Sequence, residues 1–484
     1  MSSCCTKSRS PAAQPTGQGK LSSLPVVVIG GGPVGLAAAA HLLERGLVPL
    51  VLEAESSVGA APLAWGHVHM FSPWRYNIDK AARSLLERHG WTAPDPEAFP
   101  AGRDLVHRYL APLAALPEIA GCLRLNTRVT GIARFHTGKV RDAGREQQAF
   151  EVRFETAEGK AGRQLARAVI VASGSWGNPS PAGSSGLPAI GEREAAGQIR
   201  YGMPDVLGPE RSRYAGRRVL VVGSGHSAIG TLIDLALLTE RAPGTSVLWA
   251  ARSADLTRTY GGGAADQLPQ RGALGQRLRH LVGTGKVELL APFSVDEIRR
   301  GADGCLQVLS LEGRVVETDE MVVATGLRPD LRILSEVRLD LDPALDCPRI
   351  LAPLIDPNLH SCGTVRPHGA EELAQPDTGL FLAGMASYGR APTFLLATGY
   401  EQVRSIAAFL AGDIEAARRV ELDLPQTGVC SASRTLPDTP DANACCGTET
   451  PQGICCPPKP ELAKEAPCCG ATAERDTVQP EPAK

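Results

Sequence analysis

The stretch of sequence that decides the fold is residues 25–35, which read PVVVIGGGPVG. Its first five residues are apolar and mostly β-branched, which is typical of a buried strand in a parallel sheet. Gly30, Gly32 and Gly35 follow at once, and their spacing is that of a turn that binds a dinucleotide. An alanine-rich stretch then runs to Arg45 and predicts a helix whose N-terminus faces the phosphates.

Each glycine of this turn has a separate physical task. Gly30 permits the tight turn, Gly32 lets the backbone approach a pyrophosphate, and Gly35 lets the helix pack closely on the strand. A second apolar run, residues 48–52, ends at Glu53, where a carboxylate can accept hydrogen bonds from both hydroxyls of a ribose. Together these features predict a dinucleotide site, and a purely structural glycine turn is the alternative.

The same pattern restarts near residue 218. In order, the chain has a strand (Arg218–Val222), a turn with Gly223, Gly225 and Ala228 in the third position, a helix (Ile229–Leu238) and a strand (Ser246–Ala250). No acidic residue ends the last strand, and Arg252 stands there instead. An arginine can pair with the 2′-phosphate of NADP, which a carboxylate would repel. A solvated surface arginine is the alternative.

Further apolar runs complete the predicted fold. Strands are expected over residues 168–172, followed by Ser173 and Gly174, over 321–324, followed by Thr325 and Gly326, and over 380–383, followed by Gly384; a helix is expected over 393–410. These elements predict an α/β fold with two Rossmann-like dinucleotide-binding domains. The first domain is predicted over residues 24–214 and 321–415, and the second, over 215–320, is inserted into it.

Composition and charge narrow the class of protein. Of the 484 residues 43 % are apolar, and the net charge of −2 argues against nucleic acid or an anionic membrane as the main partner. Residues 21–43 carry no charged side chain, but four glycines and a proline in their middle argue against a membrane span. The first twenty residues are polar and show no apolar signal segment, so we expect a cytoplasmic protein.

The two ends of the chain differ in composition from its middle. Residues 1–23 are rich in serine, proline, glutamine and lysine and have no acidic residue. Residues 421–484 have ten prolines and seven cysteines but no phenylalanine, tryptophan or tyrosine. Such segments cannot bury enough apolar area to offset the entropy of ordering. We therefore expect disordered tails over residues 1–23 and 416–484.

Two nucleotide folds in one chain imply two cofactors. The motifs at residues 28–35, 221–225 and 323–329 resemble those of the two-dinucleotide-binding-domain flavoproteins, a superfamily that includes flavin-containing monooxygenases and pyridine-nucleotide disulfide reductases. The resemblance implies FAD in the first domain and NADPH in the second. The candidate cofactor-binding residues are Gly30, Gly32, Gly35, Glu53, Val129, Gly174, Gly384, Gly223, Gly225, Ser227, Arg252, Thr325 and Gly326.

Departures from the disulfide reductases favour the monooxygenases. The reductases need a cysteine pair against the flavin, whereas residues 54–80 contain no cysteine and Cys305 is single in the second domain. Gly384 is followed by Met385, where the reductases have an aspartate that holds the ribityl chain. The Phe-x-Gly-x-x-x-His motif is also absent, so a typical Baeyer–Villiger enzyme or a close N-hydroxylase relative is not expected.

The densest aromatic cluster of this aromatic-poor chain is residues 65–77. In the superfamily this region lies beside the isoalloxazine ring, where flat side chains stack on a flavin and shield it from water. The candidates for contact with the flavin are Trp65, Ser72 and Trp74, together with Tyr388 and Thr393 before the last helix. The alternatives are plain packing for the cluster and a plain loop for residues 387–393.

Four vicinal cysteine pairs stand near the ends of the chain, Cys4–Cys5 and, in the C-terminal tail, Cys445–Cys446, Cys455–Cys456 and Cys468–Cys469. In a flexible tail both sulfurs of a pair can reach one soft ion, such as Hg(II), Cu(I), Zn(II) or trivalent arsenic. Body and tail together resemble the flavin monooxygenase-like proteins associated with bacterial arsenic resistance. A variable tail without such a role is the alternative.

The predicted function is that of an oxidoreductase dependent on FAD and NADPH. The resemblance implies reaction with O2 and transfer of one oxygen atom to a small molecule with a soft nucleophile, namely sulfur, nitrogen or a metalloid. One alternative is a disulfide or metal(loid) reductase whose electrons leave through the tail thiols. Another is a redox sensor that binds metal without turnover.

Overall fold

The computed structural model describes residues 21–261, 269–301, 303–359, 365–391 and 395–422. In this part of the chain two parallel five-stranded sheets and two antiparallel three-stranded sheets are formed. Each parallel sheet contains one of the two predicted strand–turn–helix–strand units. The predicted α/β fold with two Rossmann-like domains is therefore confirmed.

The first parallel sheet has the strand order β16-β7-β1-β2-β3. Its strands are β1 (Val26–Ile29), β2 (Pro49–Leu52), β3 (Leu123–Arg124), β7 (Ala168–Val171) and β16 (Leu380–Leu382). Val28 at its centre pairs with Val51 of β2 on one side and Ile170 of β7 on the other. All four strands other than β3 are buried along their length, which explains why they read as unbroken apolar runs.

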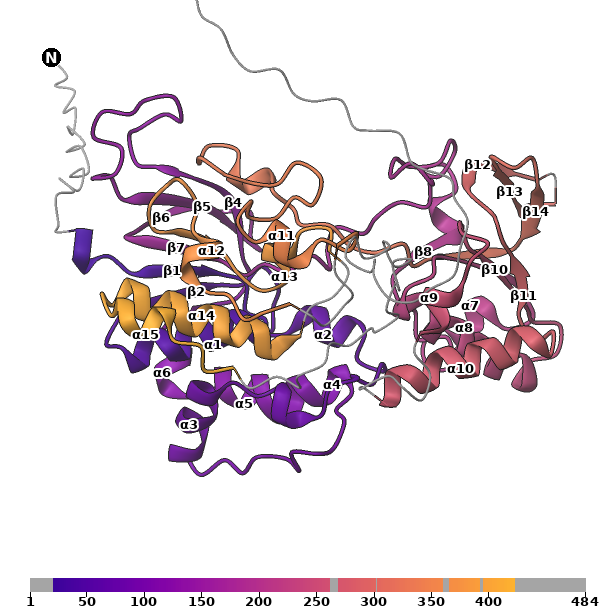
Figure 1. Cartoon of the computed structure of the whole chain (residues 1–484), viewed down its shortest axis with the longest axis horizontal. Coiled ribbons are helices and arrows are strands. Elements are labelled where there is room, and N and C mark those ends of the chain that lie inside the picture. Colours follow the sequence, from indigo (N-terminus) through magenta and orange to yellow (C-terminus); the bar gives the residue numbers. More distant parts are fainter. Residues whose placement is uncertain (1–20, 262–268, 302, 360–364, 392–394, 423–484) are drawn as a thin grey trace, which may run out of the picture. The chain divides into compact units, whose positions relative to one another are not determined.

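Alternate residues of β1 pack on opposite faces of this sheet. Val26 and Val28 share a core with helices α1 (Pro33–Glu44) and α14 (Leu396–Leu410). Val27 and Ile29 share a second core with an antiparallel sheet of β4 (Thr127–Arg134), β5 (Phe150–Thr156) and β6 (Ala161–Ala166). Figure 1 shows the two helices on one side of the parallel sheet and β4 to β6 on the other.

The second parallel sheet has the order β11-β10-β9-β15-β8. Its strands are β8 (Ile199–Tyr201), β9 (Arg218–Val222), β10 (Ser246–Ala250), β11 (Glu288–Leu290) and β15 (Glu320–Val323). Helix α8 (His226–Arg241) follows β9 and packs in one core with it, and α10 (Pro269–Gly283) lies beside α8. Because β8 and β15 pair here, the sheet includes residues before 215 and after 320. The bounds of the second domain, residues 215–320, stay a prediction.

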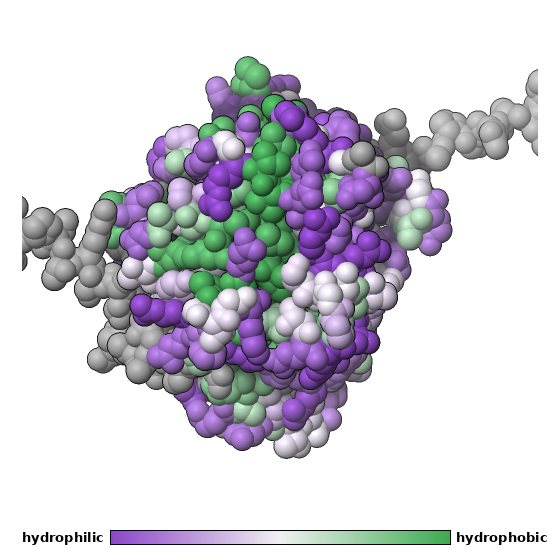
Figure 2. All heavy atoms as spheres, turned by 90° about the vertical axis from the view of Figure 1, so that its right-hand side faces the viewer, coloured by the Kyte–Doolittle hydropathy of each residue, from purple (hydrophilic) through white to green (hydrophobic). Residues whose placement is uncertain are grey.

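A small antiparallel sheet covers the other face of the second parallel sheet. It consists of β12 (Val295–Arg300), β13 (Leu306–Ser310) and β14 (Val315–Thr318), and its inner residues share a core with β9 and β15. Figure 2 views the molecule from the side of these strands and shows apolar side chains gathered in a band on that face. Exposed large apolar residues of this region include Leu187, Ile190, Leu311 and Val315.

Short helices occupy the connections. They are η1 (Leu21–Ser23), α2 (Ala60–Ala64), η2 (Trp74–Tyr76), α3 (Lys80–Arg88), α4 (Gly102–Leu105), η3 (Val106–Leu110), α5 (Ala111–Ala114), α6 (Pro117–Ala120), η4 (Ala196–Gln198), α7 (Arg211–Tyr214), α9 (Thr257–Tyr260), η6 (Arg332–Leu334), α11 (Ala352–Ile355), α12 (Ala370–Leu373), α13 (Met385–Tyr388) and α15 (Ile414–Arg418). Among the described residues, no helix combines the length and the apolar character that a membrane span requires.

Candidate dinucleotide-binding sites

The first glycine turn joins β1 to the N-terminus of α1. Gly30 has a φ of +107°, and a Cβ atom there would lie 2.6 Å from the carbonyl oxygen of Ala172. At Gly35 a Cβ atom would lie 1.9 Å from the carbonyl oxygen of Gly30, so close packing requires glycine at both positions. At Gly32 a Cβ atom would meet no atom within 4 Å. The turn therefore leaves open space at the helix N-terminus, which fits a pyrophosphate group.

Glu53, directly after β2, turns its carboxylate toward this glycine turn. Its Oε2 accepts a hydrogen bond of 2.5 Å from the backbone N–H of Gly31, and its Oε1 accepts one of 2.9 Å from the N–H of Glu55. The carbonyl of Glu53 accepts a hydrogen bond of 2.7 Å from the N–H of Thr127, at the start of β4. The structure thus brings the predicted acid and the glycine turn together, as binding of an adjacent ribose requires.

Two further predicted glycines lie at the same edge, because the carboxyl ends of parallel strands meet there. Gly174 follows β7, and a Cβ atom at its α-carbon would meet no atom within 4 Å. Gly384 follows β16, and a Cβ atom there would lie 3.2 Å from Cγ2 of Val34 in the first turn of α1. Val129 lies in β4, 9 % exposed, within the core between the two sheets. Its contact with adenine stays a prediction.

The aromatic segment 65–77 is held by buried hydrogen bonds. Ser72 Oγ donates to Asn77 Oδ1 at 2.9 Å, and Asn77 Nδ2 donates to the carbonyls of Ser72 and Pro73 at 2.7 and 3.0 Å. The hydroxyl of Tyr400 in α14 donates to the carbonyl of Asn77 at 2.9 Å. Asn77 and Tyr400 were not predicted as functional residues, and only their positions in the tertiary structure reveal that they hold this segment.

The two tryptophans of this segment lie in different surroundings. Trp74 is only 1 % exposed and belongs to the core beneath the helices, which favours the packing alternative for its side chain. Trp65 is half-buried and packs on Gly102, where a Cβ atom would lie 2.5 Å from the indole ring. Contact of either ring with the flavin stays a prediction.

A buried ionic cluster supports the end of the same segment. His41 Nε2 lies 2.9 Å from Asp79 Oδ2, and the N–H of Asp79 donates to the hydroxyl of Tyr109 at 3.1 Å. Burial opposes the charged imidazolium, but the carboxylates of Asp79 and Glu44 outweigh it and raise the pKa of His41 to about 9. Asp79 also caps α3, and an aspartate just before a helix is a signal that the sequence contains.

The candidates near the last helix are only partly described. Tyr388 ends α13 and is 2 % exposed, and its ring lies 5.7 Å from the ring of His368. Thr393 lies outside the described residues. Gln402 of α14, which was not predicted, accepts a hydrogen bond of 2.7 Å from the N–H of Gly384.

The second glycine turn repeats the geometry of the first. Gly223 has a φ of +129°, and a Cβ atom there would lie 2.3 Å from the carbonyl oxygen of Ala324, whereas at Gly225 a Cβ atom would meet no atom within 4 Å. Trp249 Nε1 donates to the carbonyl of Gly223 at 2.7 Å and supports the turn. Ser227 lies in the first turn of α8, and the open space at Gly225 adjoins the N-terminus of this helix. This turn also fits a pyrophosphate.

Arg252 and the Thr325–Gly326 pair lie at the carboxyl ends of the strands beside this turn. Arg252 is exposed, and its Nη1 donates to the carbonyl of Ser184 at 3.1 Å. Thr325 Oγ1 lies within hydrogen-bond distance of the carbonyls of Ser180 and Pro181, at 2.9 and 3.0 Å. Gly326 has a φ of +107° and open space at its α-carbon. The roles of these residues stay predictions.

The described part of the chain contains only single thiols. Cys122, Cys305 and Cys347 are free, and burial raises the pKa of Cys122 to about 11 and that of Cys347 to about 12. Such thiols are protonated at neutral pH and are poor nucleophiles. No group of three or more His, Cys, Asp or Glu side chains suited to a metal occurs among the described residues. The six predicted tail ligands, Cys445 to Cys469, lie outside them.

Comparison with known protein families agrees with this geometry. A sequence model described as pyridine nucleotide-disulphide oxidoreductase matches residues 27–347. Among curated proteins, indole-3-pyruvate monooxygenase YUCCA1 of Oryza sativa subsp. japonica is 28 % identical over 216 residues. The match covers 43 % of this chain and 44 % of that relative, so the chain spans less than half of the relative's length.

Solved structures with the same fold include both reductases and monooxygenases by name. Bacillithiol disulfide reductase Bdr of Bacillus cereus has a TM-score of 0.56 at 20 % identity, with 80 % of this chain and 99 % of that chain covered. The cadaverine monooxygenase DfoA of Erwinia amylovora has a TM-score of 0.57 at 17 % identity, with 84 % and 98 % covered. At these identities the similarity shows the fold alone.

Proposed function

We propose a monooxygenase function, and we start from the fact that this chain belongs to the pyridine nucleotide-disulphide oxidoreductase family. The predicted two-dinucleotide-binding-domain flavoprotein is thereby confirmed, as is an oxidoreductase dependent on FAD and NADPH. Within this class, we assign the chain to the enzymes that oxygenate a soft nucleophile on a small molecule. The predicted cytoplasmic location belongs to the same proposal.

The two glycine turns of this chain would hold the two cofactors. The open turn at Gly32 and the N-terminus of α1 would receive the pyrophosphate of FAD, and Glu53 would accept its ribose hydroxyls. The corresponding turn at Gly225 would receive NADPH. When bound, the flavin supplies both the acceptance of hydride from NADPH and the activation of O2. The segment 65–77, fixed by Ser72, Asn77 and Tyr400, would exclude water from it.

The observation that carries the proposal is the nature of the cysteines. A disulfide reductase of this superfamily passes electrons from the flavin to a cysteine pair, but residues 54–80 contain none. The three thiols in the described residues are single, and burial keeps Cys122 and Cys347 protonated. We therefore infer that O2, and not a protein disulfide, accepts the electrons of the flavin. The monooxygenase name of the curated relative supports the same assignment.

The experiment follows the fate of one NADPH in the presence of an organic sulfide. In a monooxygenase, NADPH, a proton, O2 and the sulfide give NADP⁺, water and the sulfoxide. We expect each molecule of sulfoxide to carry one ¹⁸O atom from ¹⁸O₂. About one molecule of sulfoxide should form for each NADPH that is oxidised. Hydrogen peroxide without sulfoxide, or rapid reduction of dithionitrobenzoate without consumption of O2, would contradict the proposal. The second result would instead favour the disulfide or metal(loid) reductase.

We further propose that the three tail pairs bind a thiophilic metal or metalloid, in line with the resemblance to arsenic-associated proteins. Thiolates prefer such ions, whereas the hydroxyl of serine is a hard ligand of similar size. Replacing Cys445, Cys446, Cys455, Cys456, Cys468 and Cys469 by serine should abolish up to three binding sites for Hg(II) or trivalent arsenic in calorimetric titration. FAD content should be unchanged.

The matched control is the double variant Cys4→Ser/Cys5→Ser, which removes the fourth vicinal pair and leaves the tail pairs intact. It should retain the tail sites. Undiminished binding in the six-serine variant would refute the metal-binding role. Tight binding by the wild type without any NADPH turnover would favour the metal-binding redox sensor over an enzyme.

A further inference from the structure

Side-chain hydrogen bonds fix both the N–H and the carbonyl of Gly384, in the turn that follows β16. Gly384 has a φ of +65°, and its N–H donates to Gln402 Oε1 at 2.7 Å. Its carbonyl accepts a hydrogen bond of 2.7 Å from Ser387 Oγ, which in turn accepts one of 2.9 Å from Gln402 Nε2. Ser387 and Gln402 are fully buried. One glutamine side chain thus determines the conformation of a turn that packs on Val34, in the first turn of α1.

The same glutamine fixes the protonation of a buried histidine. Because Gln402 Oε1 faces the N–H of Gly384, its Nε2 is a donor, and it lies 2.8 Å from His368 Nε2. His368 Nε2 must therefore be the acceptor. Its Nδ1 lies 3.1 Å from the carbonyl of Arg366 and donates to it. The network thus requires a neutral ring with the proton on Nδ1, and burial, which lowers the pKa of His368, favours the same state.

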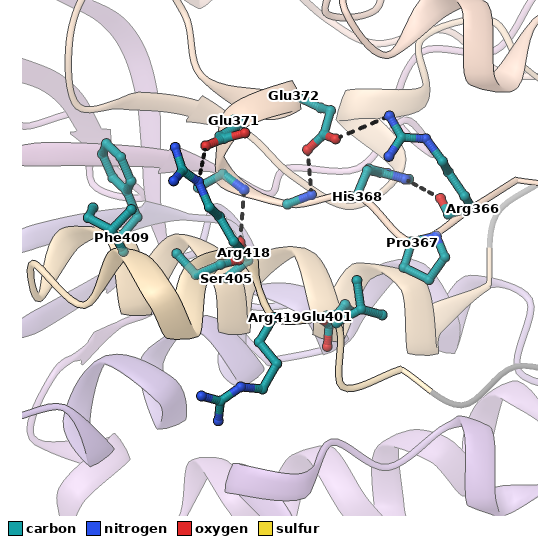
Figure 3. A pocket seen from close by; sticks show the side chains of 15 residues that line it. Arg366, Pro367, His368, Glu371, Glu372, Glu401, Ser405, Phe409, Arg418 and Arg419 are labelled. Atoms are coloured by element: carbon teal, nitrogen blue, oxygen red, sulfur yellow. Dashed lines mark hydrogen bonds and ion pairs between the residues drawn. The ribbon is translucent and has the colours of Figure 1, made fainter.

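His368 also borders a pocket of about 300 Å³. Figure 3 shows this pocket between α14 and the segment 366–372, with His368 on its wall. His368 is 4 % exposed and lines the pocket, so we take the pocket as the route by which a proton reaches its ring. The charged or titratable groups that line this pocket or contact the ring are Arg366, Glu371, Glu372, Glu401, Arg418, Arg419 and Tyr388.

We propose that Gln402 is a positioning residue that holds the Gly384 turn against FAD, and that protonation of His368 from the pocket releases this turn. A doubly protonated ring presents an N–H to the amide nitrogen of Gln402, so the amide must rotate. Its nitrogen would then face the N–H of Gly384, which loses its acceptor. The proposal rests on FAD at the first glycine turn, and it does not depend on which substrate the flavin oxidises.

The direction of the pH effect follows from the lowered pKa of His368. Below its ordinary value of 6.5 the unfolded chain binds a proton that the native network refuses, so stability at this site falls as the pH falls. The effect reaches FAD because the Gly384 turn contacts α1. From pH 7.5 to pH 5 we expect the rate of FAD release from the holoprotein to rise about tenfold, the effect of one buried hydrogen bond. The fluorescence of released FAD measures this rate.

The decisive variant is His368→Gln, whose amide oxygen can accept from Gln402 but cannot be protonated in this range. Its FAD release should be independent of pH between 5 and 7.5. The matched control is His107→Gln, which makes the same substitution at an exposed histidine of the same domain. This control should retain the acid-dependent release. Equal acid dependence in the wild type and His368→Gln would overturn the proposal.

A second variant keeps the test open if His368→Gln fails to bind FAD. In Gln402→Glu a carboxylate accepts from both the N–H of Gly384 and a protonated His368. The N–H of Gly384 then keeps an acceptor whether or not the ring is protonated, so the release of FAD should no longer accelerate between pH 7.5 and pH 5. Unchanged acid dependence in Gln402→Glu would also overturn the proposal. Both readouts use flavin release, so failure of monooxygenase activity leaves them interpretable.

Discussion

The Gly32→Val variant should fold normally and purify without its flavin. A Cβ atom at this position meets no protein atom within 4 Å, so we expect the chain to accommodate a valine there. Its branched side chain would instead occupy the open space at the N-terminus of α1, through which the pyrophosphate must pass. We expect complete loss of the yellow absorbance together with a circular dichroism spectrum like that of the wild type.

The matched control is Gly138→Val, at a glycine that also has no neighbour within 4 Å but lies on an exposed turn after β4. It should retain full flavin content. Gly35→Val is not a useful test, because a Cβ atom there would lie 1.9 Å from a carbonyl oxygen and the fold itself would fail. A yellow Gly32→Val protein at full occupancy would show that FAD does not bind at this turn.

The Arg252→Glu variant should lose its preference for NADPH. The guanidinium of Arg252 is exposed beside the second glycine turn, and its Nη1 donates to the carbonyl of Ser184. A charge-assisted contact with the 2′-phosphate is worth about 1.5–3 kcal/mol, so kcat/KM for NADPH should fall roughly ten- to a hundredfold. The value for NADH should change little, because NADH has no phosphate there.

The matched control for this variant is Arg300→Glu. Arg300 is also exposed and donates to one backbone carbonyl, that of Glu194, at the same distance of 3.1 Å. The substitution makes the same change in charge on the same domain, away from the glycine turn. It should leave the ratio of NADPH to NADH turnover unchanged. Equal losses with both nucleotides in Arg252→Glu would show that this arginine does not bind the phosphate.

The features that were predictable from the sequence are those that depend on neighbours along the chain. A strand buried on both faces must be apolar at its buried positions, and β1, β2, β7 and residues 219–222 of β9 therefore stand out in the sequence. The sheets of β4 to β6 and β12 to β14 were missed. One of their faces lies nearer the surface, so apolar and polar residues alternate there over short runs.

The glycine turns, their helices and the acid at Glu53 could be predicted because the conformation of a glycine and the length of a strand are local properties. A φ near +107° at Gly30 and a close approach at Gly35 exclude side chains whatever surrounds the turn. By contrast, the hydrogen bond between Asn77 and Tyr400 spans 323 positions of sequence. The hydrogen bonds of Gln402 with Gly384 and with His368 span 18 and 34 positions. No local pattern marks such residues, because burial and hydrogen bonding arise only when the folded chain brings distant segments together.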